Sequence, residues 1–365
     1  MNTRILYIFT RTPLHIGAGS SVGAIDQPVQ RERHTGFPII PASSLKGTFA
    51  DAWNEELLPE VRQDGTEAKV RMTKEGDASD AAWLFGSDSD AHASAGALQF
   101  SEAKVLAFPV RSAKGSFAWV TSPLLVVAKL IQHRPVWHIA HRRGWNRVLQ
   151  GNRKDRSGFK RCFRVDTIAR PLVILARAAR DGVIDQNLVP SMSKPSGDST
   201  NASDQLAFFS KAGPLALDGK VVLEEYTFTH TGDKEPDEIG SALSKLLADD
   251  PVWHEVASRL VVPSDGMMSF FAQNACEVAQ HVRINDQTGT AADGGLFNQE
   301  NVPSESMFYS LVHTFDGRGK QFDAKSADDA WNAFLSKLNE NGHVFQFGGD
   351  ASTGLGYCTV KPAQQ

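Results

Sequence analysis

The chain has 365 residues, 41% of them hydrophobic, and a formal net charge of −4, which suits one large or two modest domains with a buried core. No stretch approaches the roughly 18 consecutive apolar residues of a membrane span, and residues 1–10 have a strand pattern rather than a secretory leader. We therefore expect a soluble, cytoplasmic protein without a membrane partner. The chain also has three widely spaced cysteines and no C-x-x-C pair, which argues against a structural zinc site or a disulfide framework.

The predicted elements of the first hundred residues surround an irregular loop. Residues 5–16 have the β-branched and aromatic content of a strand, and the glycine-rich stretch 17–23 begins a loop that continues to about Gly36. Ser43 and Ser44 are typical N-caps for a helix that we expect to end near residues 58–59. The apolar positions of this predicted helix are Leu45, Phe49 and Trp53.

The remaining elements alternate irregularly, which favours an α+β fold over a doubly wound parallel sheet. Polar residues 285–295 between two apolar segments predict a long β-hairpin. Helices are expected from Ser264 onward and over 326–341, where Ser326 and Asp329 resemble a capping box. The expected strands are 98–110, 117–127, 220–230, 260–263, 307–315 and 344–347, and residues 191–204 form a low-complexity linker.

Positive charge is concentrated in residues 129–180. This stretch holds fourteen Lys and Arg residues against two acidic ones, so the remainder of the chain is acidic. Trp137, Trp145, Phe159 and Phe163 are interspersed among the basic residues. Such a composition suits phosphate contacts with stacking on bases or sugars. A solvated insertion that contacts an acidic partner protein would have the same composition.

The start of the predicted helix at Ser43 and Ser44 is a possible anion site. Unpaired N–H groups and the positive end of the helix dipole favour a phosphate, and Lys46 adds a charge in the first turn. Arg31, Arg33 and His34 lie just upstream. The alternative is that Ser43 only caps the helix and Lys46 is solvated.

Asp26 is the only carboxylate in the glycine-containing stretch 17–30. A carboxylate in such a loop can bind a divalent metal or help to remove a proton from a ribose 2′-hydroxyl. An Asp two residues before a proline is also a common turn former. His15 has a similar ambiguity, because it suits either acid–base chemistry or packing within a strand.

A second glycine-rich loop lies near the end of the chain, at residues 348–356. Its four glycines allow backbone N–H groups to approach a phosphate closely. A bare tight turn is the alternative. The loop residues that we consider for phosphate contact are Gly348, Gly349, Thr353, Gly354 and Gly356.

Three segments together carry a resemblance to a known family. They are Pro13-Leu14-His15-Ile16-Gly17-x-Gly19, Thr35-Gly36-Phe37-Pro38-Ile39-Ile40-Pro41-x-Ser43-Ser44-Leu45-Lys46-Gly47, and the glycine loop. The chain resembles the RAMP superfamily, and within it the backbone subunit of type III-B (Cmr) CRISPR complexes. Residues 22–32 are the most telling segment, because they distinguish that subunit from relatives that process guide RNA.

The resemblance implies a modified ferredoxin-like (RRM-like) palm with a β-hairpin thumb and insertions. Residues 1–128 and 205–365 then form the palm, with the thumb near 280–302, and residues 129–204 form a basic insertion and a linker. The implied partners are guide (CRISPR) RNA, complementary target RNA, further copies of the chain in a helical filament, and the other subunits of a type III-B complex. Base pairing would supply the sequence specificity.

The resemblance also implies an endoribonuclease that acts within the assembled ribonucleoprotein. It would cut target RNA at regular intervals by metal-dependent attack of the ribose 2′-hydroxyl on the adjacent phosphate. Asp26 would bind the divalent metal, Mg or Mn, or take the proton, and His15 is the second catalytic candidate. The implied RNA-binding residues are Arg31, Arg33, His34, Ser43, Ser44, Lys46, Gly348, Gly349, Thr353, Gly354 and Gly356. A guide-binding scaffold with an inert Asp26 is the alternative, and a free-standing ribonuclease is the third possibility.

Overall fold

The computed structural model describes residues 2–19, 21, 23–53, 57–61, 63–71, 79–87, 94–123, 125, 202–231, 236–318 and 322–363. The chain divides into two compact units, Met1–Pro109 with Ser269–Gln365, and Val110–Met268. It passes from one unit to the other within β8 (Ala103–Arg111) and again within α7 (Asp265–Asn274). The basic stretch 129–180 and most of the predicted insertion 129–204 lie outside the described residues, so that domain division stays a prediction.

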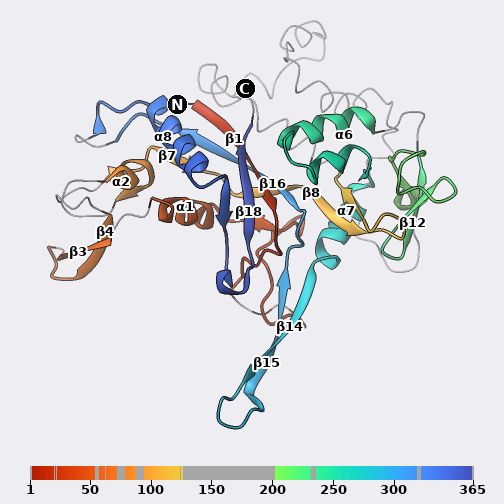
Figure 1. Ribbon diagram of the computed structural model, residues 1–365, viewed down its shortest axis with the longest axis horizontal. Coiled ribbons are helices and arrows are strands. Elements are labelled where there is room, and N and C mark those ends of the chain that lie inside the picture. Colours follow the sequence, from red (N-terminus) through yellow and green to blue (C-terminus); the bar gives the residue numbers. More distant parts are fainter. Residues whose placement is uncertain are drawn as a thin grey trace, which may run out of the picture. The chain divides into compact units, whose positions relative to one another are not determined.

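The first unit is built on an antiparallel sheet, in which β1 lies between β16 and β18 (Figure 1). Residues 5–10 of β1 are all buried, in agreement with the apolar pattern of the predicted strand, which ends at Thr10 rather than at residue 16. The strands in spatial order are β8, β16 (Met307–Thr314), β1 (Asn2–Thr10), β18 (Tyr357–Pro362) and β17 (Val344–Gln346). Two short strands join them, β2 (Ile39–Ile40) on β8 and β7 (Leu98–Phe100) on β16.

Helices α1 (Ala42–Asp51) and α8 (Ala327–Glu340) are joined to this sheet by a cluster of phenylalanines. The ring of Phe49 in α1 lies 5.1 Å from that of Phe334 in α8, centroid to centroid, and most of its neighbours meet it edge to face. Such aromatic pairs contribute about 0.5–1.5 kcal/mol beyond the area that they bury. The other members of the cluster are Phe100, Phe345 and Phe347.

The helix predicted over 326–341 is confirmed as α8, including its capping box. The Ser326 side chain accepts a hydrogen bond from the Asp329 N–H, and the Asp329 carboxylate accepts one from the Ser326 N–H. Two of the four unpaired N–H groups at the start of the helix are thereby satisfied.

The predicted N-caps of α1 are wrong. The helix begins at Ala42, and the N-cap is Pro41, whose extended backbone (φ −57°, ψ 145°) accepts the first helical bond from Leu45. Ser43 and Ser44 therefore lie inside the first turn, and α1 has no side-chain cap. The helix also ends earlier than expected, at Asp51, because residues 57–61 pair as strand β3 (Leu57–Val61) with β4 (Glu67–Arg71).

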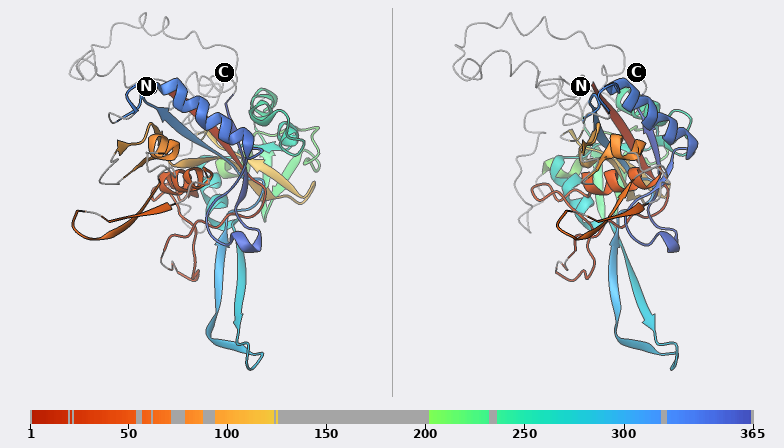
Figure 2. Two further views of the ribbon diagram at one scale, coloured as in Figure 1. Left: turned by 60° about the vertical axis from the view of Figure 1, so that its left-hand side comes forward. Right: turned by 90° about the vertical axis from the view of Figure 1, so that its left-hand side faces the viewer.

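A long antiparallel hairpin extends from the sheet, formed by β14 (Glu277–Ile284) and β15 (Ala291–Asn301) (Figures 1 and 2). This confirms the hairpin predicted near 280–302, with a shorter connection than the polar stretch suggested. Asn285 shapes the turn, since its side-chain oxygen accepts from the N–H groups of Gln287 and Thr288. Gly289 follows with a positive φ of 68°, which an L side chain rarely adopts.

Shorter elements complete the first unit, and the second unit has its own core, where the rings of Trp119 and Trp253 lie 5.6 Å apart. The remaining elements of the first unit are α2 (Asp80–Phe85), β5 (Gly86–Ser87), β6 (Ser94–Ala95) and η8 (Ala351–Thr353). The second unit contains β9 (Phe117–Val120), η4 (Ala202–Gln205), β10 (Leu206–Ala207), β11 (Lys220–Leu223), β12 (Tyr226–His230), α6 (Asp237–Ser244), η5 (Lys245–Leu247), η6 (Trp253–Ala257) and β13 (Leu260–Val261).

This mixed architecture around a mostly antiparallel sheet agrees with the α+β prediction. The helix predicted from Ser264 is observed as α7. Among the described helices, none has the length and apolar character that a membrane crossing requires.

Candidate active site

The loop that carries Asp26 lies along the outer edge of β15, at the base of the hairpin. Gln27 forms a parallel bridge with Gln299, its N–H donating to the Asn298 carbonyl at 3.1 Å. The Glu300 N–H in turn donates to the Gln27 carbonyl at 2.9 Å. The segment around Asp26 is therefore joined to the edge of the hairpin by an isolated parallel bridge.

Asp26 itself is exposed and is held by Asn298 in a reciprocal pair of hydrogen bonds. The Asp26 N–H donates to Asn298 Oδ1 at 2.8 Å, and the Asn298 N–H donates to Asp26 Oδ2 at 2.9 Å. A third bond joins Asn298 Nδ2 to the Ala24 carbonyl at 3.0 Å. Among the described residues, Asp26 Oδ1 has no hydrogen-bond partner, so one carboxylate oxygen remains available to a ligand.

Glu300, two residues after Asn298 in β15, supplies a second carboxylate. This residue is buried, with only 3% of its surface exposed. Its Oε2 accepts from the Val29 N–H at 3.0 Å, and its Oε1 pairs with the Arg31 guanidinium at 2.5 Å. Arg31 also donates to the carbonyls of Gly36 and Ala272. Its guanidinium is thus engaged inside the protein, and phosphate contact by Arg31 stays a prediction.

Cys276 lies against the same guanidinium, with 3.3 Å between its Sγ and Arg31 Nη2. Burial raises the pKa of the Cys276 thiol to about 12, although the positive charge of Arg31 acts in the opposite direction. The protonated thiol therefore serves as a weak acceptor for Arg31 rather than as a nucleophile.

His15 connects the base of the hairpin with the glycine loop. It is buried, its Nδ1 donates to the Glu300 carbonyl at 2.7 Å, and its own carbonyl accepts from the Gly349 N–H at 2.9 Å. The bond at Nδ1 assigns the hydrogen of the neutral ring to that atom, which leaves Nε2 as an acceptor. Nε2 faces Gly17, where an added Cβ would come within 3.1 Å.

The glycine loop turns most of its polar groups inward. The N–H groups of Gly349, Thr353, Gly354 and Gly356 all donate to carbonyls within the protein, and Gln346 Nε2 lies near four loop carbonyls. Gly348 has φ +78°, and an added Cβ would lie 2.0 Å from the His15 carbonyl oxygen. The inward hydrogen bonds of the loop and the close approach at Gly348 give a structural explanation for these glycines. Their contact with phosphate stays a prediction.

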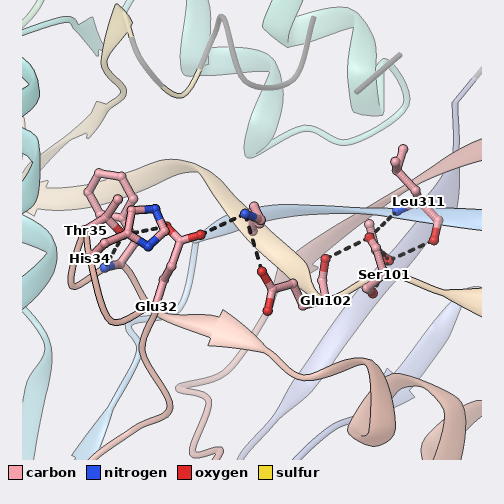
Figure 3. A network of polar contacts seen from close by, with 9 residues as sticks. Glu32, His34, Thr35, Ser101, Glu102 and Leu311 are labelled. Carbon is pink, nitrogen blue, oxygen red and sulfur yellow. Dashed lines mark hydrogen bonds and ion pairs between the residues drawn. The ribbon is translucent and has the colours of Figure 1, made fainter. Parts of the chain in front are cut away.

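The loop after Asp26 is fastened to β8 by a network of polar contacts (Figure 3). Glu32 accepts from Lys104 at 2.8 Å and from the Thr35 hydroxyl at 2.6 Å, and His34 lies 3.4 Å away. Partial burial acts to raise the pKa of Glu32, but the hydrogen bonds from Lys104 and Thr35 and the charge of Lys104 outweigh it and lower that pKa. Arg33 and the ring of His34 remain exposed.

The predicted site residues differ in burial. Asp26, Arg33, His34, Ser43 and Lys46 are exposed, Arg31 and Ser44 are half-buried, and His15 is buried. Within the described residues, no group of three His, Cys, Asp or Glu side chains is placed to hold a metal ion. Sequence reasoning missed Asn298, because nothing in its neighbourhood along the chain connects it with a loop 272 residues away.

The model of the RAMP superfamily matches residues 8–359. The chain belongs to the RAMP superfamily. Along its length it is similar to the CRISPR system Cmr endoribonuclease Cmr4 of Pyrococcus furiosus, with 28% identity over 99% of this chain and 95% of that protein. A shorter region of 97 residues is 36% identical to the CRISPR system Cms endoribonuclease Csm3 of Enterococcus italicus, covering 25% of this chain and 41% of that protein.

Solved structures of RAMP proteins share the fold. The crystal structure of oligomeric Cmr4 from Pyrococcus furiosus matches with a TM-score of 0.55 and 21% identity over 100% of this chain and 99% of that one. A cryo-EM structure of the type III-B Cmr-beta complex bound to cognate target RNA matches with a TM-score of 0.60 and 17% identity, covering 99% and 97% of the two chains. The resemblance to the RAMP superfamily noted in the sequence is confirmed by the family match over residues 8–359, and the solved structures show a shared fold.

Proposed function

We propose that this RAMP protein is a backbone subunit of a type III-B CRISPR effector that assembles along guide RNA and cleaves complementary target RNA at regular intervals. The observation that carries the proposal is the exposed Asp26 carboxylate, anchored at the base of a long hairpin with one oxygen free of partners among the described residues. Whole-length similarity to the endoribonuclease Cmr4 supports the same reaction class.

The hairpin of β14 and β15 has the features of a thumb that interrupts base pairing. Alternate residues of a strand face the same side, and Val278, Val282 and Leu296 are 51–70% exposed on one face. Asn298, opposite Gln280, lies on that same face. Exposed apolar side chains on the face that carries Asn298 suit a wedge between base steps, because they offer unstacked bases a nonpolar surface while the RNA backbone passes the Asp26 carboxylate.

Exposed basic side chains of the loop after Asp26 and of α1 suit contacts with RNA phosphates. Lys46 projects from the first half of α1, and the N-terminus of that helix has no side-chain cap to compete with a phosphate for its N–H groups. Arg33 and His34 extend from the neighbouring loop. We assign these groups to the guide or target backbone, with base pairing as the source of specificity.

In the proposed reaction, the target 2′-hydroxyl oxygen attacks the adjacent phosphorus and the P–O5′ bond breaks. The departing 5′-oxygen takes up a proton from water, and the other product ends in a 2′,3′-cyclic phosphate. Asp26 takes the hydroxyl proton or holds a divalent ion. A single carboxylate fits Mg²⁺, which keeps several waters and is commonly bound by one or two carboxylates together with substrate phosphates. The ion would supply charge stabilisation at the phosphate.

The test is cleavage by the assembled complex with Asp26→Ala in every copy, with guide RNA, complementary target and Mg²⁺ or Mn²⁺. We expect the rate of cutting to fall at least about 100-fold, the scale of losing a positioned acid or base, while target affinity is kept. Asp249→Ala, an exposed aspartate of the second unit, is the matched control.

Undiminished, evenly spaced cuts by the Asp26→Ala complex would instead favour a guide-binding scaffold. Target RNA with a single 2′-deoxy nucleotide at one cut position tests the nucleophile separately. Cutting should stop at that position alone and continue at the others.

A further inference from the structure

Asn298 bonds to the Asp26 segment through both its side chain and its backbone. Its side-chain oxygen accepts from the Asp26 N–H at 2.8 Å, and its side-chain nitrogen donates to the Ala24 carbonyl at 3.0 Å. Its backbone N–H donates to Asp26 Oδ2 at 2.9 Å, and its carbonyl accepts from Gln27 at 3.1 Å. Within the described part of the chain, the hydrogen bonds of Ala24 and Asp26 all go to Asn298.

The neighbouring polar residues of β15 are used differently. Gln299, Glu300 and Asn301 are each no more than 3% exposed, and the side chain of Gln299 bonds to Asn301 and to Asp350. Asn298 is the one among these four whose side chain bonds to Ala24 and Asp26, and an amide matches this backbone because it offers an acceptor and a donor together. Neither Gly19 nor Gly23, both with positive φ, has an atom within 4 Å of an added Cβ.

We infer that Asn298 is a positioning residue for cleavage, holding the Asp26 carboxylate with Oδ2 against the hairpin and Oδ1 toward the RNA. This inference rests on the proposed function of Asp26. Groups that orient a reacting carboxylate matter because a displacement of about 1 Å can cost about 100-fold in rate. Partners one bond removed from a ligating group commonly contribute about 10-fold to 100-fold to activity.

The experiment uses the complete guide-loaded complex with Asn298→Ala, Asn298→Ser or Asn332→Ala in every copy. Single-turnover cleavage at saturating target gives the rate constant, and a titration of target RNA gives the affinity. Asn298→Ala should lower the rate constant about 10-fold to 100-fold with target affinity unchanged. The rate constant of Asn298→Ser should lie between those of Asn298→Ala and the unchanged complex, because a hydroxyl also bonds neighbouring backbone groups but more weakly.

Asn332→Ala is the matched control, since Asn332 is an exposed asparagine of α8 outside the proposed site. It should cleave at the rate of the unchanged complex. Asn298→Ala cleaving at full rate while Asp26→Ala is inactive would overturn the positioning role and leave the proposed function intact. The positioning role would also be overturned if Asn298→Ala weakened target affinity as much as it lowered the cleavage rate constant. The same holds if Asn298→Ser cleaved no faster than Asn298→Ala. If Asn298→Ala does not assemble, the Ser variant decides by the same comparison of rate constant with affinity.

Asp26→Ala is run in parallel, because it separates the two ideas. Full activity of Asp26→Ala sinks the proposed function and this inference together, whereas an inactive Asp26→Ala leaves the Asn298 variants to decide the inference alone.

Discussion

Two carboxylates meet the base of the same hairpin, and their surroundings assign them different roles. Asp26 is exposed and exchanges hydrogen bonds with the uncharged Asn298, and its Oδ1 has no partner among the described residues. Glu300 is 3% exposed, and both of its oxygens are occupied, by the Val29 N–H and the Arg31 guanidinium. The Asp26 carboxylate, with one open oxygen, can act on a substrate. The Glu300 carboxylate, buried and fully bonded, instead stabilises the loop that carries Asp26.

Removing the buried carboxylate should give the largest loss of stability. Glu300→Ala leaves the Arg31 guanidinium, which is only 20% exposed, without its ion-pair partner. Breaking a buried pair in this way commonly costs about 3–5 kcal/mol, since the remaining charge stays desolvated. We expect the free energy of unfolding of the purified chain to fall by about that amount in urea titrations.

The same measurement on Asp26→Ala should show a change within about 0.5 kcal/mol, as for other exposed positions. Arg31→Met combined with Glu300→Met should recover much of the stability that Glu300→Ala loses, because no unpaired charge remains. Equal losses for Glu300→Ala and Asp26→Ala would contradict the division of roles between the two carboxylates.

The glycine loop should resemble the buried carboxylate rather than the exposed one. At Gly348 an added Cβ would lie 2.0 Å from the His15 carbonyl, and φ is +78°. Gly348→Ala should therefore lower the free energy of unfolding by at least about 2 kcal/mol, from backbone strain and displacement of His15. Gly47, inside α1, has no atom within 4 Å of an added Cβ, so Gly47→Ala should instead stabilise the protein by about 0.5–1 kcal/mol.

Chemical denaturation of both glycine variants makes this comparison. A Gly348→Ala protein as stable as the unchanged chain would show that the loop adapts freely, and its inward bonds would then not explain its glycines.

Local patterns predicted much of the fold, and distant pairings explain what they missed. The α8 capping box joins residues three apart, and the hairpin depends on alternation and a turn, so both were readable from the sequence. The N-cap of α1 was assigned two or three positions too late, because Ser43 and Ser44 have the usual chemistry whereas Pro41 has only the required backbone conformation.

The candidate site shows the same limit more sharply. Asp26 stood out in the sequence as a lone carboxylate in a glycine-containing loop. Its anchor Asn298 is 272 residues away, and the Arg31–Glu300 pair spans 269 residues. In the sequence, Arg31 therefore looked like one more phosphate ligand beside Arg33. Its burial against Glu300, which only the structure shows, distinguishes it from Arg33.

A third carboxylate, Glu32, is intermediate in burial and should give the smallest effect. Its lowered pKa means that its stabilisation is present above the ordinary carboxyl range and is lost as the pH falls through the lowered value. Burial acts to lower the pKa of Lys104, but hydrogen bonds and ion pairing with Glu32 and Glu102 outweigh it and raise that pKa. The stabilisation from Lys104 is therefore lost only as the pH rises through the raised value. Lys104→Met should thus cost about 1 kcal/mol at pH 7, the scale of a partly exposed pair.

Thermal unfolding of Lys104→Met from pH 7 down to pH 3 checks this sign. The difference in stability from the unchanged chain should shrink toward zero at low pH, because protonated Glu32 no longer pairs with Lys104. Lys46→Met, at an exposed lysine of α1, should show little difference at any pH. A Lys104→Met deficit that stays constant over this range would mean that Lys104 acts through the packing of its aliphatic stem, and Glu32 would then belong with the exposed carboxylate rather than between the two.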